Sequence, residues 1–358
     1  MCFDSRKNEI VILAFASVLG NQEAKAIADF LHAQGIEFKS AINQGRSVFI
    51  TRKNLDPIQK NSVSSLLSDI QFIDTQTPYQ LASSKWKKDK TIFSVKGAQI
   101  GGDEVTMIAG PCAVESEEQM FAIGDYLQSR GIRFMRGGAY KPRTSPYAFQ
   151  GMKLEGLKLL KNVADNHQLR IVTELMDLSY LEEVYDYADV IQIGTRNMFN
   201  YTLLRELGKI DKPVMLKRGF SAKVEEWLQA AEYILLGGNE KVILCERGVR
   251  SFETETRNTL DLASLALVKE LSHLPVMVDP SQGTGIRSLV TPMSLAAIAA
   301  GSDGLMIEVH GHPEEALSDG QQSLNFREFD TLLKSCRNLF DVKSRSFDFE
   351  KNSINFTT

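Results

Sequence analysis

Eight short apolar runs rich in β-branched residues, each followed by an amphipathic helical stretch, fill the sequence from about residue 105 onward. The predicted strands are 105–110, 132–136, 170–174, 190–194, 213–217, 241–246, 275–279 and 304–309. The predicted helices lie near 117–130, 153–168, 178–187, 200–208, 222–236, 258–270, 291–301 and 326–341. Short connections between alternating strands and helices predict a parallel sheet, and eight such units predict a closed (β/α)8 TIM barrel. A doubly wound open sheet is the alternative, although neither a GxGxxG nor a Walker loop follows the first strand.

The first 80 residues predict a separate small unit. Strands are expected at 10–16, 38–42, 47–51 and 70–75, with helices at 22–34 and 56–67. This βαββαβ order is the ferredoxin-like α+β pattern. The region carries no catalytic constellation, so a regulatory or oligomerisation role is expected.

The remaining segments complete the predicted organisation. Residues 81–104 are expected to be a linker and β-extension, in which the Lys-rich run 81–91 is solvated and 92–100 forms a hairpin. The catalytic barrel is assigned to 105–342, and 343–358 is a polar tail.

Composition excludes several classes of protein. The 358 residues are 43% hydrophobic and 24% charged, which is typical of globular chains and not of disordered ones. A net charge of −4 provides no global basic field for nucleic acid. The four cysteines form no CxxC pair, and no apolar stretch is long enough for a membrane span or follows a signal-peptide start. We therefore expect a cytoplasmic protein with neither nucleic acid nor membrane as a partner.

Polar residues gather at the ends of the predicted strands, where the active site of such a barrel lies. The basic ones are Arg136, Lys141, Arg143, Arg196, Lys217, Arg218 and Arg247. The acidic ones that balance them in part are Glu174, Glu246, Asp279, Glu308 and Asp319. Converging like charges are costly without counter-charges, so the excess predicts an anionic substrate that carries phosphate and carboxylate. A rim of structural salt bridges is the alternative.

Three residues in the same region could ligate a divalent metal. They are Cys112, Glu308 and Asp319, and a thiolate with carboxylates suits Mn, Fe, Co or Zn. A lone cysteine at a strand end is also commonly a buried small apolar residue. His310 fits three roles equally well, as a ligand, a proton-transfer group or a packed rim histidine.

Several segments together resemble one enzyme family. They are IAGPCAVES (108–116), RGGAYKPRTSPYAFQG (136–151), QIGTRNMFN (192–200), LKRGF (216–220), ILCERGVRSFE (243–253), LPVMVDPS (274–281) and IEVH…ALSDGQQSL (307–324). In this order and spacing they closely resemble the 3-deoxy-D-arabino-heptulosonate 7-phosphate (DAHP) synthases. The match is to the type Iβ group, in which a ferredoxin-like domain can precede the barrel, and it covers about residues 90–340.

The resemblance implies a reaction and a set of roles. The family condenses phosphoenolpyruvate with erythrose 4-phosphate, without an organic cofactor, at the entry to the shikimate pathway of aromatic amino-acid biosynthesis. Positions matching its phosphoenolpyruvate site are Arg136, Lys141, Glu174, Arg196, Lys217, Arg247 and Asp279, and those matching its aldose-phosphate loop are Lys141, Pro142, Arg143, Thr144 and Ser145. Cys112, Glu308 and Asp319 match three of four metal ligands, and Lys141 is the candidate general acid.

One position departs from the family pattern. The expected Asp-Pro-Ser-His, in which His is the fourth metal ligand, is here Asp279-Pro280-Ser281-Gln282. Three interpretations follow. Gln282 ligates weakly and shifts the preference towards Mn or Mg; His312 reaches in as a substitute ligand; or the site uses no metal, or the chain is no longer a competent synthase.

Other functions compete with this one. A 3-deoxy-D-manno-octulosonate 8-phosphate (KDO8P) synthase shares the barrel and chemistry, but its family carries Ala-Asn-Arg where this chain has Lys141-Pro142-Arg143. A secondary-pathway synthase for a modified aldose and a non-catalytic metabolite-binding homologue are further alternatives, motivated by Gln282. By analogy, the N-terminal unit would bind an aromatic amino acid as feedback effector, and the enzyme would be a homo-oligomer, tetramer or dimer.

Overall fold

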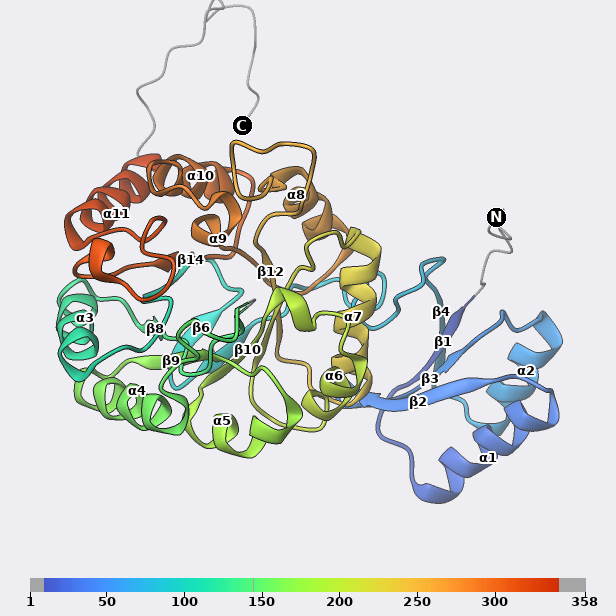
Figure 1. Ribbon diagram of the computed structural model, residues 1–358. Coiled ribbons are helices and arrows are strands. Elements are labelled where there is room, and N and C mark those ends of the chain that lie inside the picture. The colour runs from blue at the N-terminus through green and yellow to red at the C-terminus, as the bar shows by residue number, and fades with distance from the viewer. Residues whose placement is uncertain (1–9, 144, 341–358) are drawn as a thin grey trace, which may run out of the picture.

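The computed structural model describes residues 10–143 and 145–340, and its largest part is a closed barrel of eight parallel strands surrounded by helices (Figure 1). The strands follow the chain order around the barrel: β7 (Thr106–Gly110), β8 (Phe134–Arg136), β9 (Arg170–Glu174), β10 (Val190–Ile193), β11 (Val214–Lys217), β12 (Val242–Glu246), β13 (Val276–Val278) and β14 (Gly304–Glu308). Strand β14 pairs with β7 and closes the ring. The predicted TIM barrel is confirmed, and the open-sheet alternative is wrong.

The helices of the barrel also follow the predicted pattern. They are α3 (Glu117–Ser129), α4 (Lys153–His167), α5 (Leu181–Tyr187), α6 (Tyr201–Leu207), α7 (Val224–Leu236), α8 (Leu262–Leu271), α10 (Arg287–Ala299) and α11 (Phe326–Phe340). The pattern missed the short helix α9 (Pro280–Thr284), which starts directly after β13 with Asp279 as its N-cap. In the described part of the chain, no helix combines the length and the apolar character needed to cross a membrane.

A hairpin closes one end of the barrel. Strands β5 (Phe93–Val95) and β6 (Ala98–Ile100) pair antiparallel, as predicted for 92–100. Val95, Ala98 and Ile100 pack in one cluster with residues inside the barrel. The hairpin carbonyls accept hydrogen bonds from the first residues of β7 and β9, so it seals the amino ends of the strands. Only the carboxyl ends remain open to form a site.

The N-terminal unit has the expected ferredoxin-like topology. Its sheet has the order β2-β3-β1-β4, formed by β1 (Val11–Phe15), β2 (Phe38–Asn43), β3 (Arg46–Thr51) and β4 (Ile70–Asp74). Helices α1 (Asn21–Ala33) and α2 (Pro57–Leu66) cover one face (Figure 1). Asp56 caps α2 and Pro57 opens it, as the sequence indicates. A separate apolar cluster of strand and helix residues holds this unit together.

The segment 81–91 is not the solvated linker that its lysines suggest. Leu81, Ala82 and Trp86 are buried, and all three pack into the main apolar cluster of the barrel. The backbone N–H groups of Leu81 and Ala82 donate to the Glu232 carboxylate on α7 over 2.8 and 3.0 Å. The expectation of a solvated run is wrong here because the few apolar residues between the lysines decide where the backbone lies.

His273 also holds the segment 81–91 in place through two hydrogen bonds. Its Nε2 lies 2.7 Å from the Leu81 carbonyl and its Nδ1 lies 2.7 Å from the Thr91 hydroxyl. Burial lowers the pKa of His273 to about 4, although the Leu81 carbonyl favours the protonated form. The neutral ring is therefore the one that holds the segment.

This histidine predicts acid sensitivity. The folded state binds fewer protons than the unfolded chain between pH 6.5 and about 4. The free energy of unfolding is therefore unaffected by His273 above pH 6.5. It falls by a total of about 3 kcal/mol as the pH falls towards 4, because the unfolded chain binds the proton more readily. In urea unfolding from pH 7 to 4.5, His273→Gln should lose stability less steeply than the wild type. The exposed His32, changed to Gln, is the matched control, and an unchanged slope in His273→Gln would contradict the assignment.

Candidate active site

A pocket of about 210 Å³ opens at the carboxyl ends of the barrel strands. Its lining residues come from the ends of several strands and the loops after them: Arg136, Lys141, Pro142, Arg143, Glu174, Gln192, Gly194, Thr195, Arg196, Lys217, Phe220, Arg247, Arg257, Gln282 and Asp319. Seven of these residues are basic and only two, Glu174 and Asp319, are acidic. A small, strongly electropositive pocket of this kind favours a compact anion.

Two of the buried cations have unused hydrogen-bond donors. Arg136 and Arg247 are 6% and 3% exposed. Among the described residues, Nε and Nη1 of Arg136 and Nη1 of Arg247 have no hydrogen-bond partner. Buried guanidinium groups rarely remain unsatisfied, so these donors are suited to the oxygens of a bound anion.

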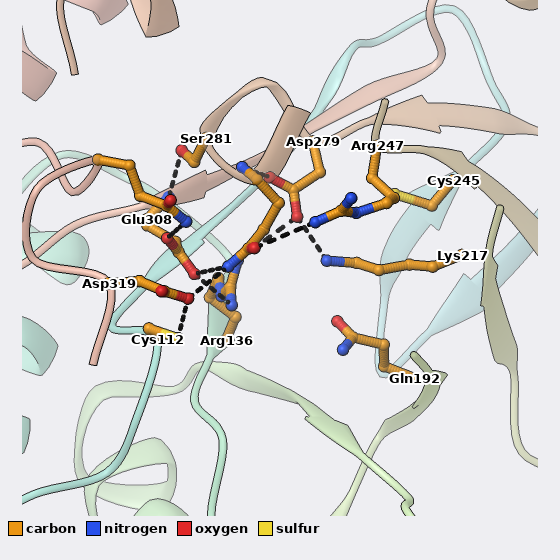
Figure 2. A network of polar contacts seen from close by, with 12 residues as sticks. Cys112, Arg136, Gln192, Lys217, Cys245, Arg247, Asp279, Ser281, Glu308 and Asp319 are labelled. Carbon is orange, nitrogen blue, oxygen red and sulfur yellow. Dashed lines mark hydrogen bonds and ion pairs between the residues drawn. The ribbon is translucent and has the colours of Figure 1, made fainter. Parts of the chain in front are cut away.

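Asp279 holds two of the pocket's cations in place. It pairs with the Lys217 ammonium and lies 3.8 Å from Arg136 Nη1 (Figure 2). Burial alone would raise the pKa of Asp279, but Lys217 and Arg136 outweigh that effect and lower it. Asp279 is therefore ionised, and it holds Lys217 and Arg136 in place.

Lys141 lines the pocket and also contacts Cys112. Its Nζ donates to the Cys112 carbonyl over 2.8 Å and to Cys112 Sγ over 3.0 Å. A Cβ on Gly138 would lie 2.8 Å from Lys141 Cδ and 2.7 Å from the Cys112 carbonyl, so only glycine leaves room for this side chain. Burial opposes the charge of Lys141, but Cys112 and Glu174 outweigh it and raise its pKa. Lys141 thus carries a proton at neutral pH.

The loop after β8 forms one wall of the pocket. Pro142 and Arg143 line it, and Arg143 donates to the Phe149 and Leu317 carbonyls. Ser145 is exposed, and Thr144 lies outside the described residues. Opposite, the Phe220 ring packs under three guanidinium groups, those of Arg196, Arg247 and Arg250, at 4.6–5.7 Å.

The acidic side of the pocket depends on a glycine. Glu174 at the end of β9 accepts from the Gln192 amide over 3.4 Å. A Cβ on Gly194 would lie 1.9 Å from Glu174 Oε1, so a side chain there would displace the carboxylate.

Two residues expected at the pocket lie elsewhere. Arg218 is buried beside the barrel wall, where its Nη1 pairs with Glu246 at 2.9 Å and Asp261 at 3.0 Å. It follows Lys217 directly, and successive strand residues point to opposite faces, which explains the difference. The prediction that Arg218 belongs to the cations of the pocket is wrong, whereas Glu246 balances a cation as expected, namely Arg218. Conversely, Arg257 lines the pocket and was missed, because it lies in the long loop after β12.

Cys112, Glu308 and Asp319 come together as expected. One ligand atom from each lies within 4.8 Å of the other two, so the group could hold a divalent metal. Burial, the charge of Glu308 and that of Asp319 raise the pKa of Cys112 to about 12 against the opposing effect of Lys141. Without an ion the residue is a thiol, and its Sγ lies 3.2 Å from Asp319 Oδ2.

Gln282 does not complete a set of four ligands. Its amide nitrogen donates to Glu308 Oε1 over 2.7 Å and to Asp319 Oδ2 over 2.9 Å. Its oxygen, the atom a metal would need, accepts from Arg247 over 3.2 Å and Arg257 over 3.1 Å. The residues around the cysteine therefore do not fit a four-ligand metal centre.

Neither nearby histidine replaces the missing ligand. The His312 side chain is 71% exposed and lies 3.8 Å from Glu314. His310 is buried, accepts from the His312 backbone N–H through Nδ1, and has Nε2 3.5 Å from Glu115. The sequence left three roles open for His310, and this buried position matches the role of a packed rim histidine.

The fold and the pocket are those of a TIM-barrel enzyme with a small, strongly electropositive site. A family model described as the DAHP synthetase I family matches residues 82–343, and the chain belongs to this family. A phospho-2-dehydro-3-deoxyheptonate aldolase of Thermotoga maritima is 48% identical over 265 residues, which are 74% of this chain and 78% of the relative.

More distant relatives and solved structures agree with this assignment. A 2-dehydro-3-deoxyphosphooctonate aldolase of Geobacter sulfurreducens is 30% identical over 70% of this chain and 97% of its own. A crystal structure of the Thermotoga maritima DAHP synthase superposes with a TM-score of 0.75 at 40% identity, covering 93% of this chain and 98% of that one. A truncated form of the same synthase gives 0.69 at 44% identity, over 74% and 97%. Together these similarities support DAHP synthase activity.

Two neighbouring arginines should separate stability from binding. Arg218→Met leaves the buried Glu246 without its cation and should cost about 3–5 kcal/mol of stability. Arg247→Met should leave the melting temperature at or above that of the wild type, because Arg247 has unused donors, and should weaken inorganic phosphate binding by about tenfold. Thermal melts with and without phosphate measure both effects. The interpretation fails if Arg247→Met unfolds the protein as readily as Arg218→Met does.

Proposed function

We propose that this pocket catalyses the DAHP synthase reaction, condensing phosphoenolpyruvate with erythrose 4-phosphate to give DAHP and phosphate. The reaction is an aldol-type carbon–carbon bond formation and opens the shikimate pathway to the aromatic amino acids. The observation that carries the proposal is the excess of buried cations with free donors in a pocket suited to a small anion. The family assignment supports it independently.

The cations would divide between the two substrates. Arg136, Lys217 and Arg247 lie deepest and would hold the phosphate and carboxylate of phosphoenolpyruvate, with Arg196 at the side. The loop 141–145, with Arg143, would hold the aldose phosphate. Lys141 lies between the two groups and would face the aldehyde.

The chemistry proceeds in three steps. C3 of phosphoenolpyruvate attacks the aldehyde carbon, and the aldehyde oxygen takes a proton from Lys141 Nζ. Water then adds to the cationic C2 and loses one proton. In the resulting hemiketal the bond from C2 to the phosphate oxygen breaks, the hydroxyl proton passes to the departing phosphate, and C2 becomes the ketone carbon. The fixed guanidinium and ammonium groups stabilise the anionic oxygens throughout, because they are already oriented in a buried pocket. Glu174, the acidic group beside Lys141, is the candidate acceptor for the proton of the attacking water.

The aldose preference rests on the loop after β8. Lys141-Pro142-Arg143 matches the DAHP synthase pattern and not the Ala-Asn-Arg of the sister family. The difference in identity, 48% against 30%, points the same way. The octulosonate reaction, or a modified aldose of a secondary pathway, is the second candidate, favoured only by the altered residue Gln282. A non-catalytic homologue is disfavoured by the retained cations.

A metal is the part of the family pattern that fits least well. Cys112, Glu308 and Asp319 would be the ligands, and a thiolate with two carboxylates suits Mn, Fe, Co or Zn. Gln282 presents its nitrogen to this position and therefore does not supply a fourth ligand.

Other proposals concern the whole molecule. The ferredoxin-like unit of residues 1–80 would bind an aromatic amino acid and regulate the barrel of 105–342, with 81–104 between them. We also propose that the enzyme is a cytoplasmic homo-oligomer, a tetramer or dimer.

Lys141 provides a direct test of the reaction. Lys141→Met should lower kcat by about 10²–10⁴-fold because the aldehyde oxygen loses its proton donor. The loss of phosphoenolpyruvate absorbance on adding erythrose 4-phosphate measures the rate, and arabinose 5-phosphate in its place tests the octulosonate alternative. Lys158→Met, on the exposed face of α4, is the control. Equal rates for Lys141→Met and wild type would remove Lys141 from the mechanism.

Deletion of residues 1–76 tests the regulatory role. Tyr79 and Leu81 stay in the shortened chain because both pack into the barrel core. We expect the shortened enzyme to keep its activity and to lose inhibition by tyrosine or phenylalanine. Initial rates with increasing effector measure this, and a full-length enzyme insensitive to both amino acids would contradict the regulatory proposal.

A further inference from the structure

We propose that this synthase works without a divalent ion, and that the Gln282 amide takes the place of the ion between Glu308 and Asp319. The inference rests on the proposed function only for its turnover measurements. The group that lies between the Glu308 and Asp319 carboxylates is seen in the structure itself.

The Gln282 nitrogen lies where a cation would bind. It is 2.7 Å from Glu308 Oε1 and 2.9 Å from Asp319 Oδ2, and it has one N–H for each oxygen. A metal bound by the same oxygens would lie about 2.0–2.2 Å from each and would overlap the amide nitrogen. The two carboxylates are therefore bridged by a neutral donor that belongs to the chain.

The direction of the amide is fixed by charge. The Oε1 atom faces two guanidinium groups, those of Arg247 and Arg257, at 3.2 and 3.1 Å. A 180° rotation that offered the oxygen to a metal would turn the NH2 group towards both arginines and remove an acceptor from each. The present orientation satisfies all four neighbours, and the rotated one satisfies none of them in the absence of an ion.

A second glutamine reinforces this arrangement. Gln322 donates to Glu308 Oε2 over 2.5 Å, and its oxygen accepts from Arg257 over 2.9 Å. Arg136 also donates to Glu308 Oε1, over 3.0 Å. Both oxygens of Glu308 are thus engaged by fixed donors, as the network in Figure 2 shows in part.

The backbone holds Gln282 in position for this role. Its N–H donates to Asp279 Oδ1 over 2.9 Å in the first turn of α9, and its carbonyl accepts from Asn258 over 3.1 Å. The side chain is 8% exposed. Gln282 is therefore a positioning residue, which fixes Glu308 and Asp319, while Lys141 remains the group that meets the aldehyde oxygen.

Cobalt titration of the full chain tests the proposal without turnover. Co²⁺ bound through Cys112 gives a thiolate charge-transfer absorption in the near ultraviolet. Wild-type protein should show no such band, and Gln282→His should acquire one and bind Co²⁺ tighter by about tenfold or more, the scale on which even indirect changes alter metal affinity. Gln321→His, at an exposed neighbouring glutamine, is the matched control. Gln282→Glu, which loses the neutral donor and adds a carboxylate, is the second variant and should also gain Co²⁺ affinity.

Turnover gives the second readout. The wild-type rate should change less than about twofold after dipicolinate treatment or Mn²⁺ addition. Loss of a catalytic metal would lower the rate far more, because such a metal stabilises the charge of the transition state. The Gln282→His rate should become dependent on added metal. A thiolate band in the wild type, with one equivalent of Co²⁺ and chelator-sensitive turnover, would overturn this inference and leave the proposed function intact. No product under any condition would instead overturn the proposed function, and the cobalt spectrum would still decide the inference.

Discussion

Two buried carboxylates, Asp279 after β13 and Glu308 at the end of β14, make the electropositive pocket possible. Asp279 pairs with Lys217 and faces Arg136, and Glu308 pairs with Arg136 at 3.0 Å. Each carboxylate is completely buried, so its interaction with the cations is weakly screened. They neutralise part of the pocket's positive charge, and they leave Nε and Nη1 of Arg136 without a hydrogen-bond partner among the described residues. Without them, the converging cations would be too costly to bury in an empty pocket.

The barrel positions these charges through its topology. The hairpin β5–β6 fills the amino ends of the strands, which leaves the carboxyl ends as the site. Loops from separate strands then converge on one pocket, although their residues are far apart in sequence. Glycines at 138 and 194 provide the space in which Lys141 and Glu174 lie. Close packing at these two glycines therefore fixes where the Lys141 and Glu174 side chains lie.

The alternating strand and helix pattern predicted the barrel well because its β-branched runs are buried on both sides. The same pattern could not separate Lys217 from Arg218. Lys217 ends β11 and Arg218 follows it directly, and only side-chain direction decides that Lys217 enters the pocket and Arg218 pairs with Glu246. Arg257 was beyond reach for another reason, since its loop folds back through the Val249–Thr259 bridge. Residues 81–91 show a third limit, because three buried apolar side chains decide the position of a segment in which most residues are polar.

Gln282 shows how one neutral side chain can bridge two carboxylates of an anion site without adding a charge. A divalent ion would add two positive charges beside Arg257, whose Nη1 already lies 3.6 Å from Asp319. An amide in the same position adds none, yet it gives hydrogen bonds to both carboxylates and accepts from both arginines. If the site works without an ion, as we propose, the positive charge of the pocket comes from its seven basic side chains alone. Because Arg136, Lys217 and Arg247 are already buried in the pocket, their charges need little reorganisation to stabilise a bound anion.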